Sequence, residues 1–106
     1  MIERVWHGWT APEDADEYER LLREELMPRF AEETTDEYLG IRLLRRSHGD
    51  EVEFVTSMRF ASLDAVEGFA GESYEEAHVP PAARELLSRY DDRVAHYELR
   101  ERREYD

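Results

Sequence analysis

The sequence predicts an α+β fold in which helices cover one face of a single antiparallel-rich sheet. Two β-rich runs, 38–46 and 51–60, flank the short polar stretch SHGD, a pattern typical of a hairpin. Before and after this hairpin, apolar residues recur every three or four positions, as they do on one face of an amphipathic helix. Further β-rich runs at 2–9 and 92–100 complete the element order β-α-β-β-α-β.

The first strand and the first helix are predicted from composition and spacing near the N-terminus. Residues 2–9 are rich in β-branched and aromatic side chains and end at the polar stretch TAPED. Thr10 and Glu13 have the spacing of a capping box, and Pro12 suits a first helical turn. The helix is then defined by apolar side chains that share one face: Tyr18, Leu21, Leu22, Leu26 and Phe30.

The hairpin register decides which side chains reach the core. A loop at His48-Gly49, or a longer one over 47–50, pairs Leu43 with Phe54. Because side chains alternate between the two faces of a strand, one face is expected to be apolar and to form the core. Its members are Leu39, Ile41, Leu43, Phe54, Thr56 and Met58. The opposite face receives a mixed set, namely Tyr38, Arg42, Leu44, Val55 and Arg59.

Prolines and caps mark the limits of the helices. Pro28 has no amide hydrogen, so the first helix is expected to kink or end at the residue before it. Ser62 can cap a short helix that Gly71 ends. Pro81 can open a third helix, which is expected over 81–90 and leads to the last strand. Together the elements give a ferredoxin-like plan.

The mixed second face of the sheet predicts a homodimer. Its apolar side chains expose too much surface to remain in water: Tyr38, Leu44, Val55 and either Trp6 or Trp9. The same face of a second copy can cover this surface, and two-fold dimers are the commonest oligomers. Two ferredoxin-like domains paired through their sheets form a dimeric α+β barrel, which is the architecture expected here.

Composition bounds the number of domains and the classes of partner. The chain has 106 residues, enough for a single domain, which is expected over 1–100 with 101–106 as a frayed tail. It carries 27 acidic residues against 14 basic ones, a formal net charge of −13. Such a charge repels nucleic acid and anionic lipid, so neither is expected as a partner. The absence of cysteine excludes disulfides and thiolate chemistry.

The composition of the chain also bears on the cellular location that is expected for the protein. All the basic residues are arginine and none is lysine. Two sources fit this bias: a high-salt cytoplasm, in which carboxylates keep a protein hydrated, or a GC-rich genome. No apolar run approaches the roughly 20 residues of a membrane span. The N-terminus lacks the apolar stretch and cleavage site of a signal peptide, so a cytoplasmic location is expected.

With these elements in place, the chain resembles a known family. The stretches GIRLLRR (40–46), EVEFVTSMRF (51–60) and SYEEAHVPPAARELL (73–87) resemble the antibiotic-biosynthesis-monooxygenase-like proteins of the dimeric α+β barrel superfamily. The likeness covers 2–99 and implies the dimeric barrel. It also implies the activities found in that superfamily, which include cofactor-free oxygenation of polyketide quinols and degradation of haem.

The haem-degrading branch is the sharpest comparison. There, an apolar stretch that contains tryptophan leads to a histidine that ligates haem iron. Here, a run formed by Phe60, Ser62, Ala65 and Phe69 leads to His78. Phe69 replaces the tryptophan, its spacing to His78 is one residue short, and the first strand lacks the asparagine that would contact bound oxygen. The resemblance therefore favours the oxygenase branch, in which no cofactor is expected, over haem degradation.

Two histidines are the candidate catalytic residues. His78 ends the acidic stretch YEEAH just before Pro80 and Pro81, which stiffen the segment as a positioned base or ligand requires. His96 lies on the last predicted strand, from which it could reach a pocket between sheet and helices. Imidazole titrates near neutral pH and can carry a proton. The alternatives are a solvent-facing His78 at a helix entry and a structural, hydrogen-bonded His96.

A pocket for a small aromatic or apolar ligand is predicted from four further side chains. These are Trp6, Phe54, Phe69 and Tyr74, which would otherwise belong to the core. Because no HxH or HExxH spacing occurs, no metal site is predicted. The GxSxG pattern of a nucleophilic serine is also absent.

Two functions are compatible with these residues. The first is a cofactor-independent monooxygenase that acts on a small quinol- or anthrone-type aromatic. A histidine would take the substrate proton, and the resulting carbanion would reduce dioxygen. The second is a small-ligand-binding or structural dimer without turnover. A titratable group inside a closed apolar pocket distinguishes the first function from the second.

Overall fold

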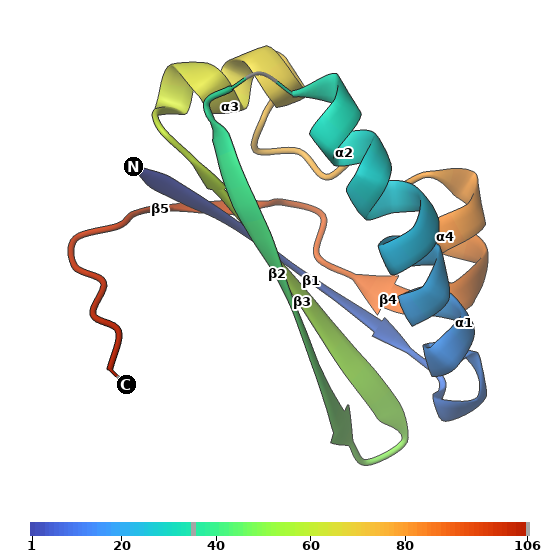
Figure 1. The fold of residues 1–106 in the computed structure, drawn as a ribbon. Helices are drawn as coiled ribbons and strands as arrows, with labels where there is room; N and C mark the ends of the chain where they lie inside the picture. The colour runs from blue at the N-terminus through green and yellow to red at the C-terminus, as the bar shows by residue number, and fades with distance from the viewer. Residues whose placement is uncertain (35, 106) are drawn as a thin grey trace.

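The computed structural model describes residues 1–34 and 36–105, and it has one sheet with helices on one side (Figure 1). Within this part of the chain the strands are β1 (Ile2–Thr10), β2 (Tyr38–His48), β3 (Glu51–Phe60), β4 (Leu87–Tyr90) and β5 (Ala95–Glu98). The helices are α1 (Ala15–Leu21), α2 (Met27–Glu33), α3 (Leu63–Ala70) and α4 (Pro81–Leu86). The predicted α+β class with an antiparallel sheet is confirmed, and the element order is compatible with a ferredoxin-like fold.

The sheet has the order β2-β3-β1-β4, and β5 also pairs with β1. All these pairs are antiparallel. β4 lies beside Gly8–Thr10 and β5 lies beside Ile2–Val5, so the two short strands share one edge of β1. The order of the sheet places β1 in its interior, with β3 on one side and these two strands on the other (Figure 1).

The expected helix over 81–90 is wrong in its second half. α4 ends at Leu86, and the next four residues form β4, in which Tyr90 pairs with Gly8 and Arg89 pairs with Trp9. The backbone groups of this segment are therefore bonded to the free edge of β1. Tertiary pairing of this kind outweighs a weak local helical preference. The last strand is also shorter than the expected 92–100, because β5 covers only Ala95–Glu98.

The hairpin is confirmed as an element, but its register differs from the predicted one. Its turn lies at Gly49-Asp50, with Gly49 at a φ of 64°, a left-handed conformation that suits glycine. Leu43 therefore pairs with Thr56 and not with Phe54. The shift is an even number of residues, so the side chains from residue 40 to the turn keep their predicted faces.

A β-bulge at Leu39 moves two side chains away from their predicted faces. Tyr38 pairs with Phe60 and Gly40 pairs with Arg59, so Leu39 is the extra residue. Leu39 was expected in the core but is 40% exposed. Tyr38 was expected on the second face but lies in the core, where its ring centroid is 5.3 Å from that of Phe60.

The predicted capping box is wrong. Thr10 is the last residue of β1 and pairs with both Val52 and Leu87, so its side chain is held by the sheet. Its hydroxyl is buried without a hydrogen-bond partner among the described residues. The 3₁₀ turn Pro12–Asp14 leads into α1 instead, and its N-cap residue, Ala11, has no side-chain cap. By contrast, the Ser62 hydroxyl does accept a hydrogen bond from the Ala65 amide at the start of α3.

Pro28 changes the first helix without ending it. A π-helical segment, Leu22–Leu26, joins α1 to α2, and the Met27 amide donates to the Leu22 carbonyl. Since Pro28 cannot donate to the carbonyl of residue 24, the hydrogen-bond register must change at this point. The wider turn absorbs the proline, so α2 continues to Glu33.

The core lies between the helices and one face of the sheet. One buried cluster joins α1 to the hairpin end of β3, where the rings of Tyr18 and Phe54 meet edge-on at 5.0 Å. A second cluster joins the other end of β3 to α3 through Phe60 and Val66. Phe30 of α2 packs against both clusters. Between these two clusters the layers are less completely filled.

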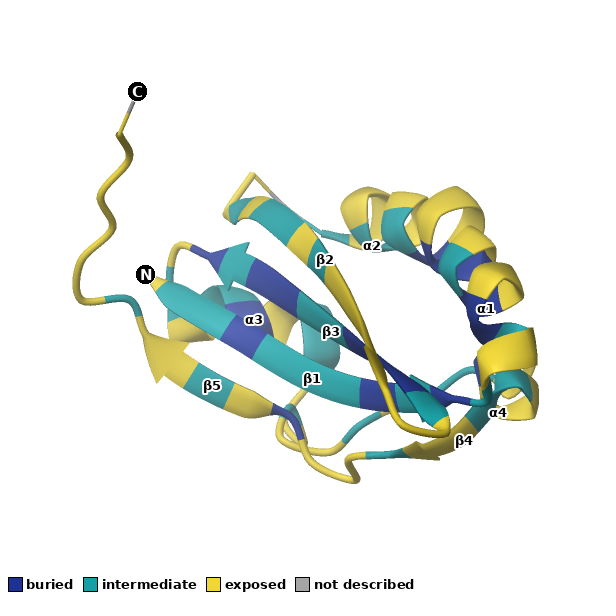
Figure 2. Ribbon diagram, turned by 90° about the horizontal axis from the view of Figure 1, so that it is seen from below, coloured by how far each residue is buried: buried dark blue, intermediate teal, exposed yellow. Residues whose placement is uncertain are grey.

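The face of the sheet away from the helices is not covered within one chain (Figure 2). It carries exposed apolar side chains, including Leu44 at 49% and Tyr97 at 58% exposure. Residues 101–105 follow Leu99 without regular secondary structure and are exposed. In the described part of the chain, no helix is long and apolar enough to cross a membrane.

Candidate functional site

A cavity of about 300 Å³ lies between the sheet and the helical layer. β1 and β3 form its floor, and the helices together with the segment 77–80 form its walls. Most of its lining is apolar, and it contacts members of both core clusters: Tyr18, Leu22, Leu26, Phe30, Met58 and Phe69. A concave, largely apolar space with a few polar groups is the usual form of a small-molecule site.

The π-helical segment helps to shape this cavity. Leu22 and Leu26, the first and last residues of the segment, both line it. The wider turn places these two side chains on the cavity side while Pro28 continues into α2. Single π-helical turns of this kind recur at functional sites.

Arg4 is the charged group at the floor of the cavity. It lies on the inward face of β1 between Ile2 and Trp6 and is only 9% exposed. Its Nη1 donates to the Tyr74 carbonyl at 2.7 Å and to His96 Nε2 at 2.9 Å. Among the described residues, no carboxylate forms an ion pair with it. Burial lowers the pKa of Arg4 to about 10, so the guanidinium remains charged at neutral pH.

His96 lies behind Arg4 and holds it in place. Burial is the main cause that lowers the pKa of His96, and the charge of Arg4 adds to it, while Glu75 opposes both. The imidazole is therefore neutral at neutral pH, and its Nε2 can accept the hydrogen bond from Arg4. The ring of Tyr74 packs edge-on against the imidazole at 5.1 Å.

His78 lies at the rim of the cavity. The residue contributes to the lining, together with its neighbours Val79 and Pro80, and it is exposed to solvent. In the described part of the chain, its imidazole has no hydrogen-bond or ion-pair partner. It is thus open to a ligand in the cavity and to water, and no neighbouring side chain fixes its orientation.

The predicted aromatic residues separate into three groups. Trp6 and Phe69 line the cavity, and the Trp6 indole donates to the Asp91 carbonyl at 2.8 Å. Tyr74 does not line the cavity, but its carbonyl accepts a hydrogen bond from Arg4 and its ring packs against His96. Phe54 is fully packed in the core and does not reach the cavity.

Arg4 was missed by the prediction, although the sequence holds a signal for it. In a strand, alternate residues share a face, so the apolar pair Ile2 and Trp6 predicts that Arg4 points inward with them. A charged residue at an inward position is rare unless it is paired or functional. Its distance to His96 could not be predicted, because it depends on how β5 pairs with β1.

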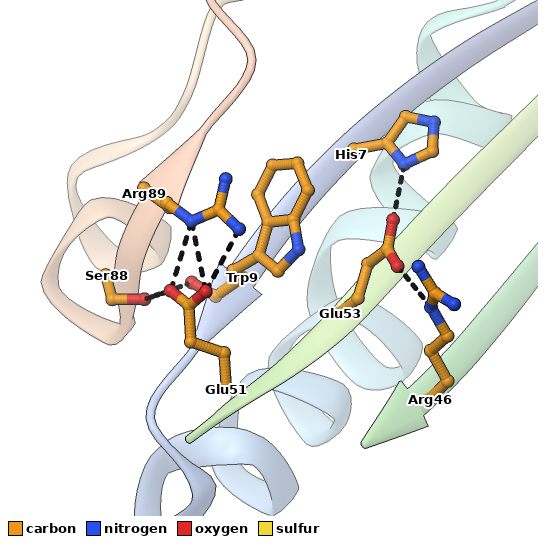
Figure 3. A network of polar contacts seen from close by, with 7 residues as sticks. All are labelled: His7, Trp9, Arg46, Glu51, Glu53, Ser88 and Arg89. Carbon is orange, nitrogen blue, oxygen red and sulfur yellow. Dashed lines mark hydrogen bonds and ion pairs between the residues drawn. The ribbon is translucent and has the colours of Figure 1, made fainter. Parts of the chain in front are cut away.

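A second group of polar residues lies on the open face of the sheet (Figure 3). Glu53 is 6% exposed, and its carboxylate accepts hydrogen bonds from His7 and Arg46, which lower its pKa. Glu51 accepts from Arg89 and Ser88. The Arg89 guanidinium also stacks on the ring of Trp9, 3.8 Å from its centroid. These charges are matched within the chain, in contrast to Arg4.

Neither similarity to known proteins nor a metal-binding group of side chains assigns a function to this site. No group of three histidine, aspartate or glutamate side chains in the described residues could hold a metal ion. Comparison with models of known protein families gives no match, and comparison with curated proteins gives no similar sequence. The site is therefore interpreted from its own geometry.

We expect the pKa of His96, measured by NMR titration of its ring protons, to lie below the ordinary 6.5. Arg4→Met should raise this pKa because it removes a positive charge, but only in part, since burial is the larger cause. The free energy of unfolding should fall as the pH drops below 6.5, because the unfolded chain binds a proton that the folded state rejects. The exposed Arg23→Met is the matched control, and a pKa unchanged by Arg4→Met would contradict the contact.

Proposed function

We propose that this chain is a cofactor-independent monooxygenase-like protein that binds a small quinol- or anthrone-type aromatic in the cavity between sheet and helices. The observation that carries the proposal is the cavity itself, which Trp6 and Phe69 line and which has a histidine, His78, at its rim. Its volume of about 300 Å³ is at the lower end of ordinary ligand pockets, which suits a small aromatic. We place the protein, on its sequence resemblance, among the antibiotic-biosynthesis-monooxygenase-like proteins.

The chemistry requires a base and a dry site. His78 removes a proton from a CH₂ group beside an aromatic carbonyl, and the resulting carbanion transfers an electron to dioxygen. Substrate radical and superoxide then combine to a peroxide, which loses water to leave a ketone. One oxygen atom enters the product and the other leaves as water, so the substrate supplies all the electrons. The apolar walls favour this course because they exclude bulk water from the carbanion.

The proposal includes a homodimer that closes into a barrel through the open faces of two sheets. Exposed Leu44 and Tyr97 give this face an apolar component. Its buried carboxylate, Glu53, already pairs with Arg46 and accepts a hydrogen bond from His7, so a second copy can cover it without leaving that charge unpaired. Covering this face is the simplest way to remove the exposed apolar surface from water.

A ligand-binding dimer without turnover is the second candidate. It is favoured by one observation: the imidazole of His78 is exposed and has no hydrogen-bond partner among the described residues. A catalytic base is usually held in place by a neighbouring group. A protein that only binds its ligand needs no such base.

Replacing His78 tests the catalytic role. In oxygen-uptake assays with an anthrone-type substrate, His78→Ala should lower kcat by about 10²-fold, the usual contribution of a general base. His48→Ala, which removes an exposed histidine at the hairpin end, should match the wild type.

Each other result has a distinct meaning for the two candidates. Turnover that survives in His78→Ala contradicts His78 as the base. Substrate binding without oxygen uptake in the wild type favours the binding protein. A haem Soret band that His78→Ala abolishes favours the haem-degrading branch instead.

The oligomeric state can be measured by sedimentation equilibrium. At micromolar concentration the wild type should have twice the chain mass of 12.6 kDa. Leu44→Glu should weaken the dimer, because it places a charge in the apolar part of the covered face. Leu39→Glu, at the exposed bulge, is the control. A wild-type monomer across the concentration series would rule out the barrel.

A further inference from the structure

The charge of Arg4 is not neutralised by the protein. Its partners among the described residues are a backbone carbonyl, a neutral imidazole and the face of Phe69, whose centroid lies 5.8 Å from the guanidinium carbon. All of these are dipoles or a ring quadrupole and carry no net charge. The acidic residue that follows Tyr74, Glu75, forms its ion pair with Arg93.

A buried charge of this kind is unusual. Removing a guanidinium from water costs free energy, and proteins normally recover it with an opposite charge and further hydrogen bonds. Two arginines on the sheet that are more exposed do pair with carboxylates, Arg46 with Glu53 and Arg89 with Glu51. Among the described residues Arg59 has no carboxylate partner either, but it does not line the cavity. Arg4 is therefore a buried charge without a carboxylate partner at the floor of an apolar cavity.

The guanidinium also has donors to spare. Both of its hydrogen bonds use Nη1, which leaves Nε and Nη2 without a partner among the described residues. The fork of an arginine matches the two oxygens of a carboxylate, and it equally donates to a single phenolate or enolate oxygen. His96 and the Tyr74 carbonyl hold the remaining corner of the group, so its orientation is fixed before a ligand arrives.

We propose that Arg4 is the anion-binding residue of the cavity, and that the ligand is an aromatic oxyanion whose negative oxygen contacts Arg4 while its rings pack against Trp6 and Phe69. The aromatic part rests on the proposed function, whereas the oxyanion part rests on Arg4 alone. If the monooxygenase chemistry takes place here, the same charge stabilises the enolate that forms when the substrate loses its proton.

The acidic surface does not prevent an anion from binding here. The chain has a net charge of −13, which repels anions at long range. At physiological ionic strength, charges further than about 8 Å from the ligand are largely screened, whereas a buried pair is screened much less. The near contact with Arg4 therefore outweighs the distant acidic groups. The cavity lining includes one acidic residue, Glu33, and a second basic residue, Arg29.

A matched pair of probes tests this proposal. 2-Naphthoate and 2-naphthamide have nearly the same shape, but only the first is an anion at pH 7. By isothermal titration calorimetry, the wild type should bind naphthoate at least about tenfold more tightly, the value of one charge-assisted hydrogen bond. Arg4→Met should abolish this preference and Arg4→Lys should keep part of it. The exposed Arg23→Met is the control and should behave as the wild type.

A second measurement on the wild type does not depend on the fold of a variant. Besides burial, the charges that act on the pKa of His96 are those of Arg4, which lowers it, and Glu75, which raises it, and the ring of Tyr74 packs against the imidazole. Naphthoate should raise the pKa of His96, because a bound anion neutralises the repulsion from Arg4. Naphthamide should leave it unchanged. A naphthoate complex in which the titration of His96 does not move overturns the proposal.

The outcomes separate this inference from the proposed function. Equal binding of naphthoate and naphthamide overturns the oxyanion role of Arg4 and leaves an aromatic pocket. Arg4-dependent binding of octanoate, without binding of any aromatic probe, supports the anion site and counts against an aromatic substrate. No binding of naphthoate, naphthamide or octanoate overturns both.

Discussion

The hydrogen bonds of the buried guanidinium of Arg4 are the constraint on which the site depends. Strand alternation forces this side chain inward between Ile2 and Trp6, where water cannot solvate it fully. Its contacts with the Tyr74 carbonyl and His96 then tie β1 to the connector after α3 and to β5. These contacts place Arg4 against an apolar cavity, and the charge of Arg4 adds to the burial that lowers the pKa of His96.

Much of the fold follows from local sequence patterns, and the errors arise where distant segments meet. The β-rich composition of their sequences identified β1 and the hairpin, and Ser62 and Gly71 marked the limits of α3. The segment 87–90 could not be identified as a strand, because its helical pattern yields only when the edge of β1 is free to pair with it. The bulge at Leu39 likewise depends on how Tyr38 packs on Phe60, which no local pattern contains.

The candidate site could also be predicted only in part, because local patterns do not show how distant segments pack. Trp6, Phe69 and His78 were chosen for their residue type and do line the cavity, because each lies near an element end or an inward strand position. Phe54 has the same chemistry but meets Tyr18 in the core, and only packing distinguishes the two cases. Arg4 was overlooked because arginine is common on the exposed face of a strand. Its role depends on its being buried without a counterion, which the sequence alone does not show.

The most direct measurement is a crystal structure of the protein grown with 2-naphthoate. The account predicts a carboxylate in the cavity, with its oxygens 2.7–3.2 Å from the free nitrogens of Arg4, and with His96 Nε2 still accepting from Nη1. An Arg4 side chain that is paired with a carboxylate of the protein itself, from the same chain or from a second copy, would contradict the account, as would naphthoate bound away from Arg4.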